Sequence, residues 1–122
     1  MNNTTDNTFG EFIRQQREAL RAEDPRFSLR QLAVRIGVEP SYLSKVERGE
    51  QPPPSEQKII ALATELNEDS DVLLAMAGKV SSDLLAVIRR RPHLFSQLIR
   101  EMKDLPDHSV LRLVREIRDG NW

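Results

Sequence analysis

Apolar residues recur at three- and four-residue spacing along most of the chain, in short segments that are separated mainly by glycine and proline. Leu29, Leu32, Ala33 and Ile36, for example, would share one face of a helix that Gly37 ends. We find no segment that alternates apolar and polar residues as a strand would, and no internal repeat. The sequence therefore predicts an all-α protein, whose short helices must pack on one another to be stable.

Start and stop signals divide the chain into segments. Thr8 with Glu11, and Ser28 with Gln31, have the spacing of capping boxes. The predicted helices cover residues 8 to about 22, 29–36, 40–48, 56–66, 70–77, 82–91, 92–104 and 106–118. We interpret this pattern as a disordered arm (1–7), a five-helix domain (8–78) and a C-terminal three-helix segment (79–122).

Several functional classes are excluded by missing residues. The chain has no Cys and only two His, His93 and His108, so we expect no metal site and no cofactor. It lacks the sequence motifs of common hydrolases, P-loop proteins and dinucleotide enzymes, and we expect no enzymatic activity. It also lacks an apolar run of about 18 residues and the pattern of an export signal, so we expect a cytoplasmic protein with no membrane partner.

The formal charge of −1 conceals an uneven distribution. Residues 8–48 carry eight basic and six acidic side chains, residues 49–78 one basic and six acidic, and residues 79–122 nine basic and six acidic. Two basic segments are thus separated by an acidic one. Such a distribution permits a nucleic-acid-binding face on a nearly neutral protein.

The most informative pattern lies between Leu29 and Glu47. Ala33 is small where two helices must cross closely, and Gly37, four residues later, suits a tight turn with positive φ. Leu43 and Val46 would then pack the next helix onto the first. This is the spacing of a helix-turn-helix, in which the second helix enters the major groove of DNA.

Residues 9–78 resemble the Xre/Cro-cI family of phage-repressor-like regulators. The resemblance rests on this spacing, on the capped helix that precedes it and on the tail Y-L-S-K-V-E-R-G-E. The resemblance implies a five-helix domain that binds double-stranded DNA. Its expected base-edge contacts are Pro40, Ser41, Ser44 and Lys45, with Tyr42 beside them, and its expected phosphate contacts are Ser28, Arg30 and Arg48. Leu29 stands where many family members have Gln. The resemblance also implies a structural ion pair between Arg17 and Glu47.

The side chains on the predicted DNA-binding face suit these roles. Lys45 can donate to guanine or phosphate, and Ser41 and Ser44 can donate or accept at several bases. Tyr42 either contacts DNA or packs against the domain. No Arg, Asn or Gln precedes Arg48 on this face, so we expect selectivity to depend partly on DNA shape.

Residues 79–122 are rich in apolar side chains for so short a segment. Three short helices cannot bury all of them internally, so we expect a partner surface, most simply a second copy of the chain. The alternative is that these helices pack on the first five in one monomeric core. The predicted oligomerisation residues are Leu94, Phe95, Leu98, Ile99, Met102, Val110, Leu113, Val114 and Ile117.

Two functions remain open from the sequence. The first is a homodimeric, or higher-order, transcriptional regulator that represses from an inverted-repeat operator. The second is an antitoxin or adaptor whose C-terminal helices bind a partner protein, with DNA binding as autoregulation. The partner of an antitoxin would be a toxin. The resemblance also implies a third possibility, a repressor that a regulatory peptidase encoded beside it inactivates by cleavage.

Overall fold

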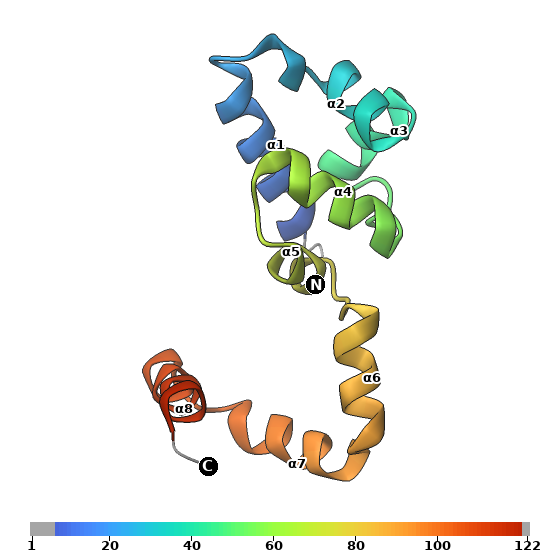
Figure 1. The fold of residues 1–122 in the computed structure, drawn as a ribbon. Coiled ribbons are helices and arrows are strands. Elements are labelled where there is room, and N and C mark those ends of the chain that lie inside the picture. The colour runs from blue at the N-terminus through green and yellow to red at the C-terminus, as the bar shows by residue number, and fades with distance from the viewer. Residues whose placement is uncertain (1–6, 121–122) are drawn as a thin grey trace. The chain divides into compact units, whose positions relative to one another are not determined.

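The computed structural model describes residues 7–120, and all regular secondary structure in that range is helical (Figure 1). The all-α prediction is therefore confirmed. The chain divides into two compact units, one ending at Ser81 and the other starting at Ser82. Of the predicted disordered arm, only Asn7 lies within the described residues. No described helix is long and apolar enough to cross a membrane.

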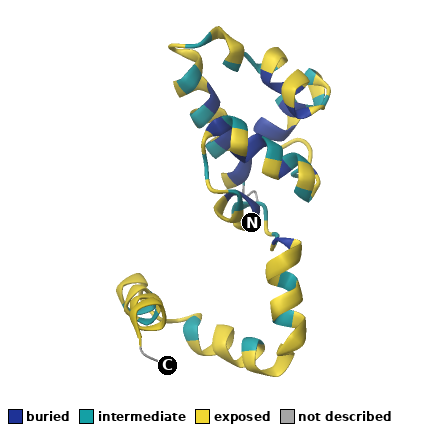
Figure 2. Ribbon diagram, viewed as in Figure 1, coloured by how far each residue is buried: buried dark blue, intermediate teal, exposed yellow. Residues whose placement is uncertain are grey.

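The first unit contains five α-helices and one 3₁₀ turn within its described residues. They are α1 (Thr8–Arg21), η1 (Pro25–Phe27), α2 (Leu29–Ile36), α3 (Pro40–Glu47), α4 (Glu56–Leu66) and α5 (Ser70–Met76). Each helix contributes aliphatic side chains to one core, shown as dark blue ribbon in Figure 2. The core residues are Phe9, Ile13, Leu32, Ala33, Ile36, Leu43, Val46, Ile59, Leu62, Ala63, Leu66, Leu73 and Leu74.

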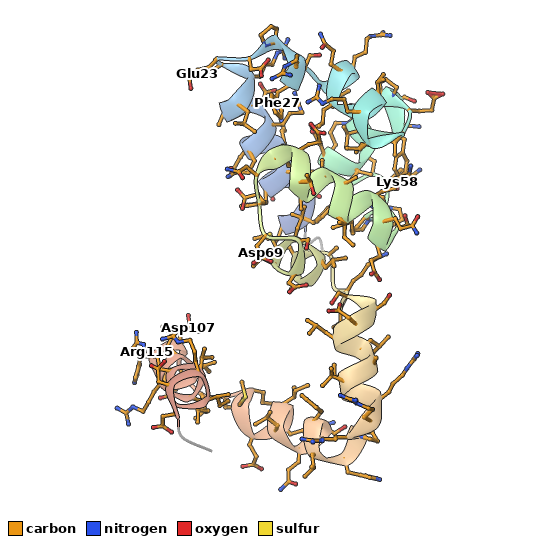
Figure 3. The ribbon with its side chains drawn as sticks, in the orientation of Figure 1. Glu23, Phe27, Lys58, Asp69, Asp107 and Arg115 are labelled. Atoms are coloured by element: carbon orange, nitrogen blue, oxygen red, sulfur yellow. The ribbon has the colours of Figure 1, made fainter. Side chains whose placement is uncertain are left out.

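Local capping accounts for several helix ends. The Ser28 hydroxyl accepts the Gln31 N–H at 3.2 Å at the start of α2, and Ser55 accepts the Lys58 N–H at 3.4 Å at the start of α4. The Asp69 carboxylate caps α5 in the same way (Figure 3). Gly37 ends α2 in the left-handed conformation that the sequence predicted for it, with φ of 77°.

Two local predictions in the first unit were wrong or incomplete. Asn7, rather than Thr8, is the N-cap of α1, and the Asn7 side chain donates to the Glu47 carbonyl at 3.1 Å instead of capping the helix. The sequence prediction therefore placed the N-cap of this helix one residue too late. The loop before α2 contains η1, which the sequence analysis missed. There the Asp24 carboxylate caps the turn by accepting the Arg26 N–H at 2.9 Å.

The second unit consists of α6 (Ser82–Arg90), α7 (Pro92–Met102) and α8 (Asp107–Asp119). All three are amphipathic, yet none of their residues is buried (Figure 2). Among the predicted oligomerisation residues, Leu94, Leu98, Ile99, Val114 and Ile117 are exposed, and Phe95, Met102, Val110 and Leu113 are half-buried. The second unit therefore leaves many of its apolar side chains in contact with solvent.

Candidate nucleic-acid interface

The turn between α2 and α3 is fixed from three sides. Inside the turn, the Val38 N–H donates to the Ala33 carbonyl at 2.9 Å. From α4, the Lys58 ammonium donates to the Gly37 carbonyl at 3.2 Å (Figure 3). Beneath the turn, Ala33 and Leu43 are buried in the core. The two helices therefore have the fixed relative orientation that a helix-turn-helix requires.

The two faces of α3 differ sharply. Leu43, Val46 and Glu47 are buried against the rest of the unit. On the other side Ser41, Lys45 and Arg48 are exposed, and Pro40, Tyr42 and Ser44 are half-buried. The structure thus gathers the predicted base-contact residues on one helix face, at the solvent boundary.

An ion pair between Arg17 and Glu47 joins α1 to the buried face of α3. The Arg17 Nε and Nη2 atoms donate to the two Glu47 carboxylate oxygens at 2.8 and 3.0 Å. Each side chain is only 5% exposed. Arg17 also donates to the Phe27 carbonyl at 3.2 Å. The hydrogen bond with Glu47 raises the pKa of Arg17 above its ordinary value, against the effect of burial.

Gly10 lets α1 approach the end of α3 more closely than any other residue type would. A Cβ at this position would lie 2.4 Å from the Val46 carbonyl oxygen and 2.8 Å from that of Glu47. Those oxygens are backbone atoms, which cannot rotate away. Gly10 and Asn7 were not predicted from the sequence, although a glycine inside an amphipathic helix often marks such a contact.

We expect Gly10→Ala to lower the free energy of unfolding by about 2 kcal/mol, because the added methyl group would push α1 away from α3. Helix propensity alone would have the opposite effect, since Ala stabilises a helix relative to Gly by about 1 kcal/mol. Urea denaturation of the full chain measures the change. The exposed residue Gln15, also on α1, provides the control: Gln15→Ala should change stability by no more than about 0.5 kcal/mol. A Gly10→Ala variant as stable as wild type would contradict the close approach.

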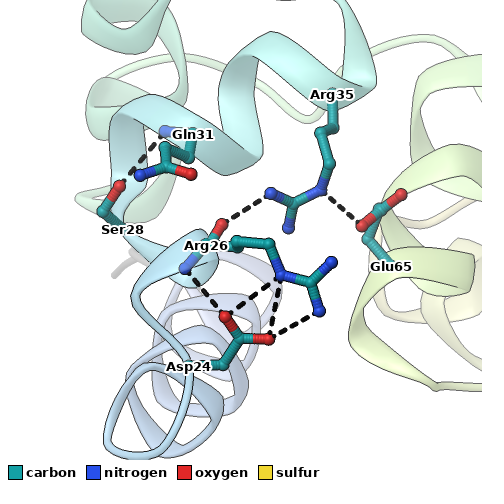
Figure 4. Close-up of polar contacts among 6 residues, drawn as sticks. All are labelled: Asp24, Arg26, Ser28, Gln31, Arg35 and Glu65. Atoms are coloured by element: carbon teal, nitrogen blue, oxygen red, sulfur yellow. Dashed lines mark hydrogen bonds and ion pairs between the residues drawn. The ribbon is translucent and has the colours of Figure 1, made fainter.

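A second polar network positions α2 (Figure 4). Arg35 donates to the Arg26 carbonyl at 2.6 Å and pairs with Glu65 of α4 at 2.7 Å. Its guanidinium also lies 5.0 Å from the centre of the Phe27 ring. Arg35 thereby connects α2 to η1 and to α4.

The three predicted phosphate contacts differ in their surroundings. The Arg30 side chain is exposed and forms no ion pair or hydrogen bond with the described part of the chain. Ser28 is half-buried, and its hydroxyl oxygen is used as the α2 cap. Arg48 is exposed but pairs with Glu50, with Nε and Nη2 at 2.7 and 3.2 Å from the carboxylate oxygens. Glu50 was not among the functional residues predicted from the sequence.

Tyr42 makes contacts within its own unit. Its ring packs against the core, and its hydroxyl donates to the Pro52 carbonyl at 3.4 Å. These contacts correspond to the packing role left open by the sequence. They orient the connection that leads from α3 to α4.

Comparison with known proteins agrees with this geometry. Residues 8–75, which include α1 to α4 and most of α5, match the helix-turn-helix domain family. The chain belongs to this family. Two proteins named uncharacterized HTH-type transcriptional regulators, from two strains of Mycobacterium tuberculosis, are each 44% identical to it over 69 residues. No solved structure is significantly similar.

The match covers only part of this chain and only part of each relative. It covers 57% of the present helix-turn-helix chain and 45% of each relative. The chain therefore spans less than half the length of the relatives it matches. The matched family and the names of the two relatives support DNA-binding transcriptional regulation.

Proposed function

We propose that this helix-turn-helix protein is a sequence-specific regulator of the Xre/Cro-cI type that acts in the cytoplasm as a dimeric repressor. The observation that carries the proposal is the orientation of α3. Its apolar side is buried, and Ser41 and Lys45 are exposed on the opposite side. A helix held in this way can enter the major groove with polar side chains directed at base edges.

Different side chains would contact the bases and the phosphates of the DNA. Lys45 can donate to guanine, and Ser41 and Ser44 can donate or accept at several bases. Arg30, near the start of α2, would bind the DNA backbone. Such contacts fix the position of the protein on DNA but do not distinguish sequences. None of these contacts requires a cofactor.

Dimerisation is supported by the exposed apolar surface of the second unit. Paired copies would present two α3 helices to one DNA face, and the resulting two-fold symmetry suits an inverted repeat. A dimer bound there would exclude other proteins from the same DNA, which is the simplest form of repression.

Selection from a pool of random duplexes with the full-length protein tests this proposal and does not require the operator to be identified first. We expect enrichment of an inverted repeat whose half-sites are centred about 10–10.5 base pairs, or a multiple of this, apart. Enrichment of a single asymmetric site would contradict the dimeric arrangement. No enrichment of any sequence would contradict sequence-specific binding.

Replacement of Lys45 or Ser41 by Ala should weaken binding to the selected operator by about 1–3 kcal/mol in each case. Both side chains are exposed, so the melting temperature should not change. Fluorescence anisotropy with a labelled operator measures the affinities. Lys103→Ala removes an exposed cation outside the family match and is the control for a general charge effect. Unchanged affinity in both α3 variants would argue against the assigned face.

A further inference from the structure

Glu50 is the acidic side chain that pairs with Arg48 at the C-terminal end of α3, and its position is determined by the backbone. Gly49 follows the helix in the left-handed conformation, with φ of 78°. The Gly49 N–H then donates to the Val46 carbonyl at 3.1 Å, and the Glu50 N–H to the Lys45 carbonyl at 2.8 Å. This pair of bonds is a Schellman motif. The motif places the Glu50 side chain beside the last turn of α3.

The Arg48 guanidinium uses the Nε–Nη2 edge and one Nη1 N–H in this arrangement. Its Nε and Nη2 atoms donate to the two Glu50 oxygens, and its Nη1 atom donates to the Ser44 hydroxyl oxygen. Phosphate binds arginine through the same planar pair of N–H groups that a carboxylate occupies. A DNA phosphate and the Glu50 carboxylate are therefore alternative partners of the Nε–Nη2 edge of this guanidinium.

The surroundings of this pair allow exchange. The side chains of Arg48 and Glu50 are 49% and 54% exposed. Exposed ion pairs are weak, so a phosphate can displace the carboxylate. The hydrogen bond from Arg48 lowers the pKa of Glu50 below its ordinary value, and Lys45 acts in the same direction. Glu50 is thus ionised at neutral pH, and its negative charge remains near the DNA if Arg48 changes partner.

We propose that Glu50 limits the affinity of the protein for duplex DNA of any sequence by competing with backbone phosphate for Arg48. The inference rests on the proposed function, because it concerns the same DNA-binding face. It divides that face into two parts. Ser41 and Lys45 would distinguish sequences, whereas the Arg48–Glu50 pair would set the sequence-independent part of the affinity.

Glu50→Gln in the full-length chain tests the proposal, with a fluorescein-labelled random-sequence duplex of 24 base pairs as the probe. The substitution keeps the size of the side chain and removes its charge. One additional phosphate contact should make the slope of log affinity against log salt steeper by about 0.9. It should also tighten binding about 5- to 10-fold at 0.1 M salt. The selected operator should show the same ratio, since a phosphate contact carries no sequence information.

An Arg48→Ala background separates competition from simple repulsion. If Glu50 acts through Arg48, the gain from Glu50→Gln should fall below about 2-fold when Arg48 is absent. Asp71→Asn, on α5, removes the same charge at another exposed position and should change the affinity less than about 2-fold. The melting temperature of each variant shows that the fold is kept.

The outcomes are distinguishable. Tighter binding that is lost in the Arg48→Ala background supports the inference. Two results would overturn the inference but leave the proposed function standing. The first is an unchanged affinity of Glu50→Gln, and the second is a gain of equal size with Arg48 present and with Arg48→Ala. Failure of the wild type and every variant to bind either duplex overturns the proposed function itself.

Discussion

A chain that ends after Ser81 should remain folded and should bind its operator about 100-fold or more weakly than the full-length protein. The first unit has its own core, to which the helices α1 to α5 all contribute. The truncated chain would, however, lose the apolar helices α6 to α8, through which we propose that two copies associate. Its second half-site would then no longer be held at high effective concentration.

Sedimentation and operator titration measure both parts of this prediction. The full-length chain should sediment as a dimer or a larger species at tens of micromolar, and the truncated chain as a monomer. Thermal denaturation of the truncated chain shows whether the first unit folds alone. If the full-length chain is monomeric and both forms bind the operator equally well, the C-terminal helices have another role. An intramolecular core or a docking surface for a partner protein, as in an antitoxin or adaptor, would then be favoured.

Single replacements within the second unit provide a finer test. Leu98 and Ile117 are exposed apolar residues on α7 and α8. Their replacement by Asp should weaken association, because a charge would have to be buried in the interface. The same replacements would not disturb a core within the unit, since neither side chain is buried.

Glu47→Ala should lower the free energy of unfolding by about 3–5 kcal/mol, the second large effect that we expect. Arg17 would remain almost completely buried, with the Phe27 carbonyl and the half-exposed Glu18 carboxylate as its remaining partners. A buried cation without its principal counter-ion is far more costly than an absent surface contact. Urea denaturation of the full-length chain measures the loss.

Two further variants test whether the cost arises from the uncompensated charge. Glu65→Ala breaks the more exposed pair with Arg35 and should cost no more than about 1 kcal/mol. Replacement of both Arg17 and Glu47 by apolar residues should be less destabilising than the sum of the single replacements, because no charge is then left unpaired. A Glu47→Ala variant as stable as Glu65→Ala would show that the buried pair contributes little.

The features predicted correctly from the sequence are those determined by residues close together in the chain. The Ser28–Gln31 spacing predicted a capped helix start, and the Ser28 hydroxyl does accept the Gln31 N–H. Gly37 was predicted to terminate α2 with positive φ, as observed. The periodicity of apolar residues likewise identified the buried side of α3, including Leu43 and Val46. In each case the relevant residues lie within one or two helical turns of each other.

Two of the remaining features depend on contacts between distant segments, and a third depends on the conformation of one turn. Asn7 donates to the Glu47 carbonyl, 40 residues away, instead of capping the helix that it precedes. Arg35 reaches both Arg26 and Glu65, a combination that no local pattern contains. Glu50 was part of the recognised tail, but only the turn at Gly49 brings its carboxylate onto the Arg48 guanidinium.

The central claim is that the exposed side of α3 binds duplex DNA, and chemical-shift mapping tests it most directly. Backbone amides of the isotope-labelled full-length protein would be recorded during titration with the selected operator duplex. We predict that the largest shifts occur at Ser41, Ser44 and Lys45 on α3 and at Arg30 near the start of α2. Unperturbed α2 and α3 amides, with shifts confined to α6–α8, would contradict the account.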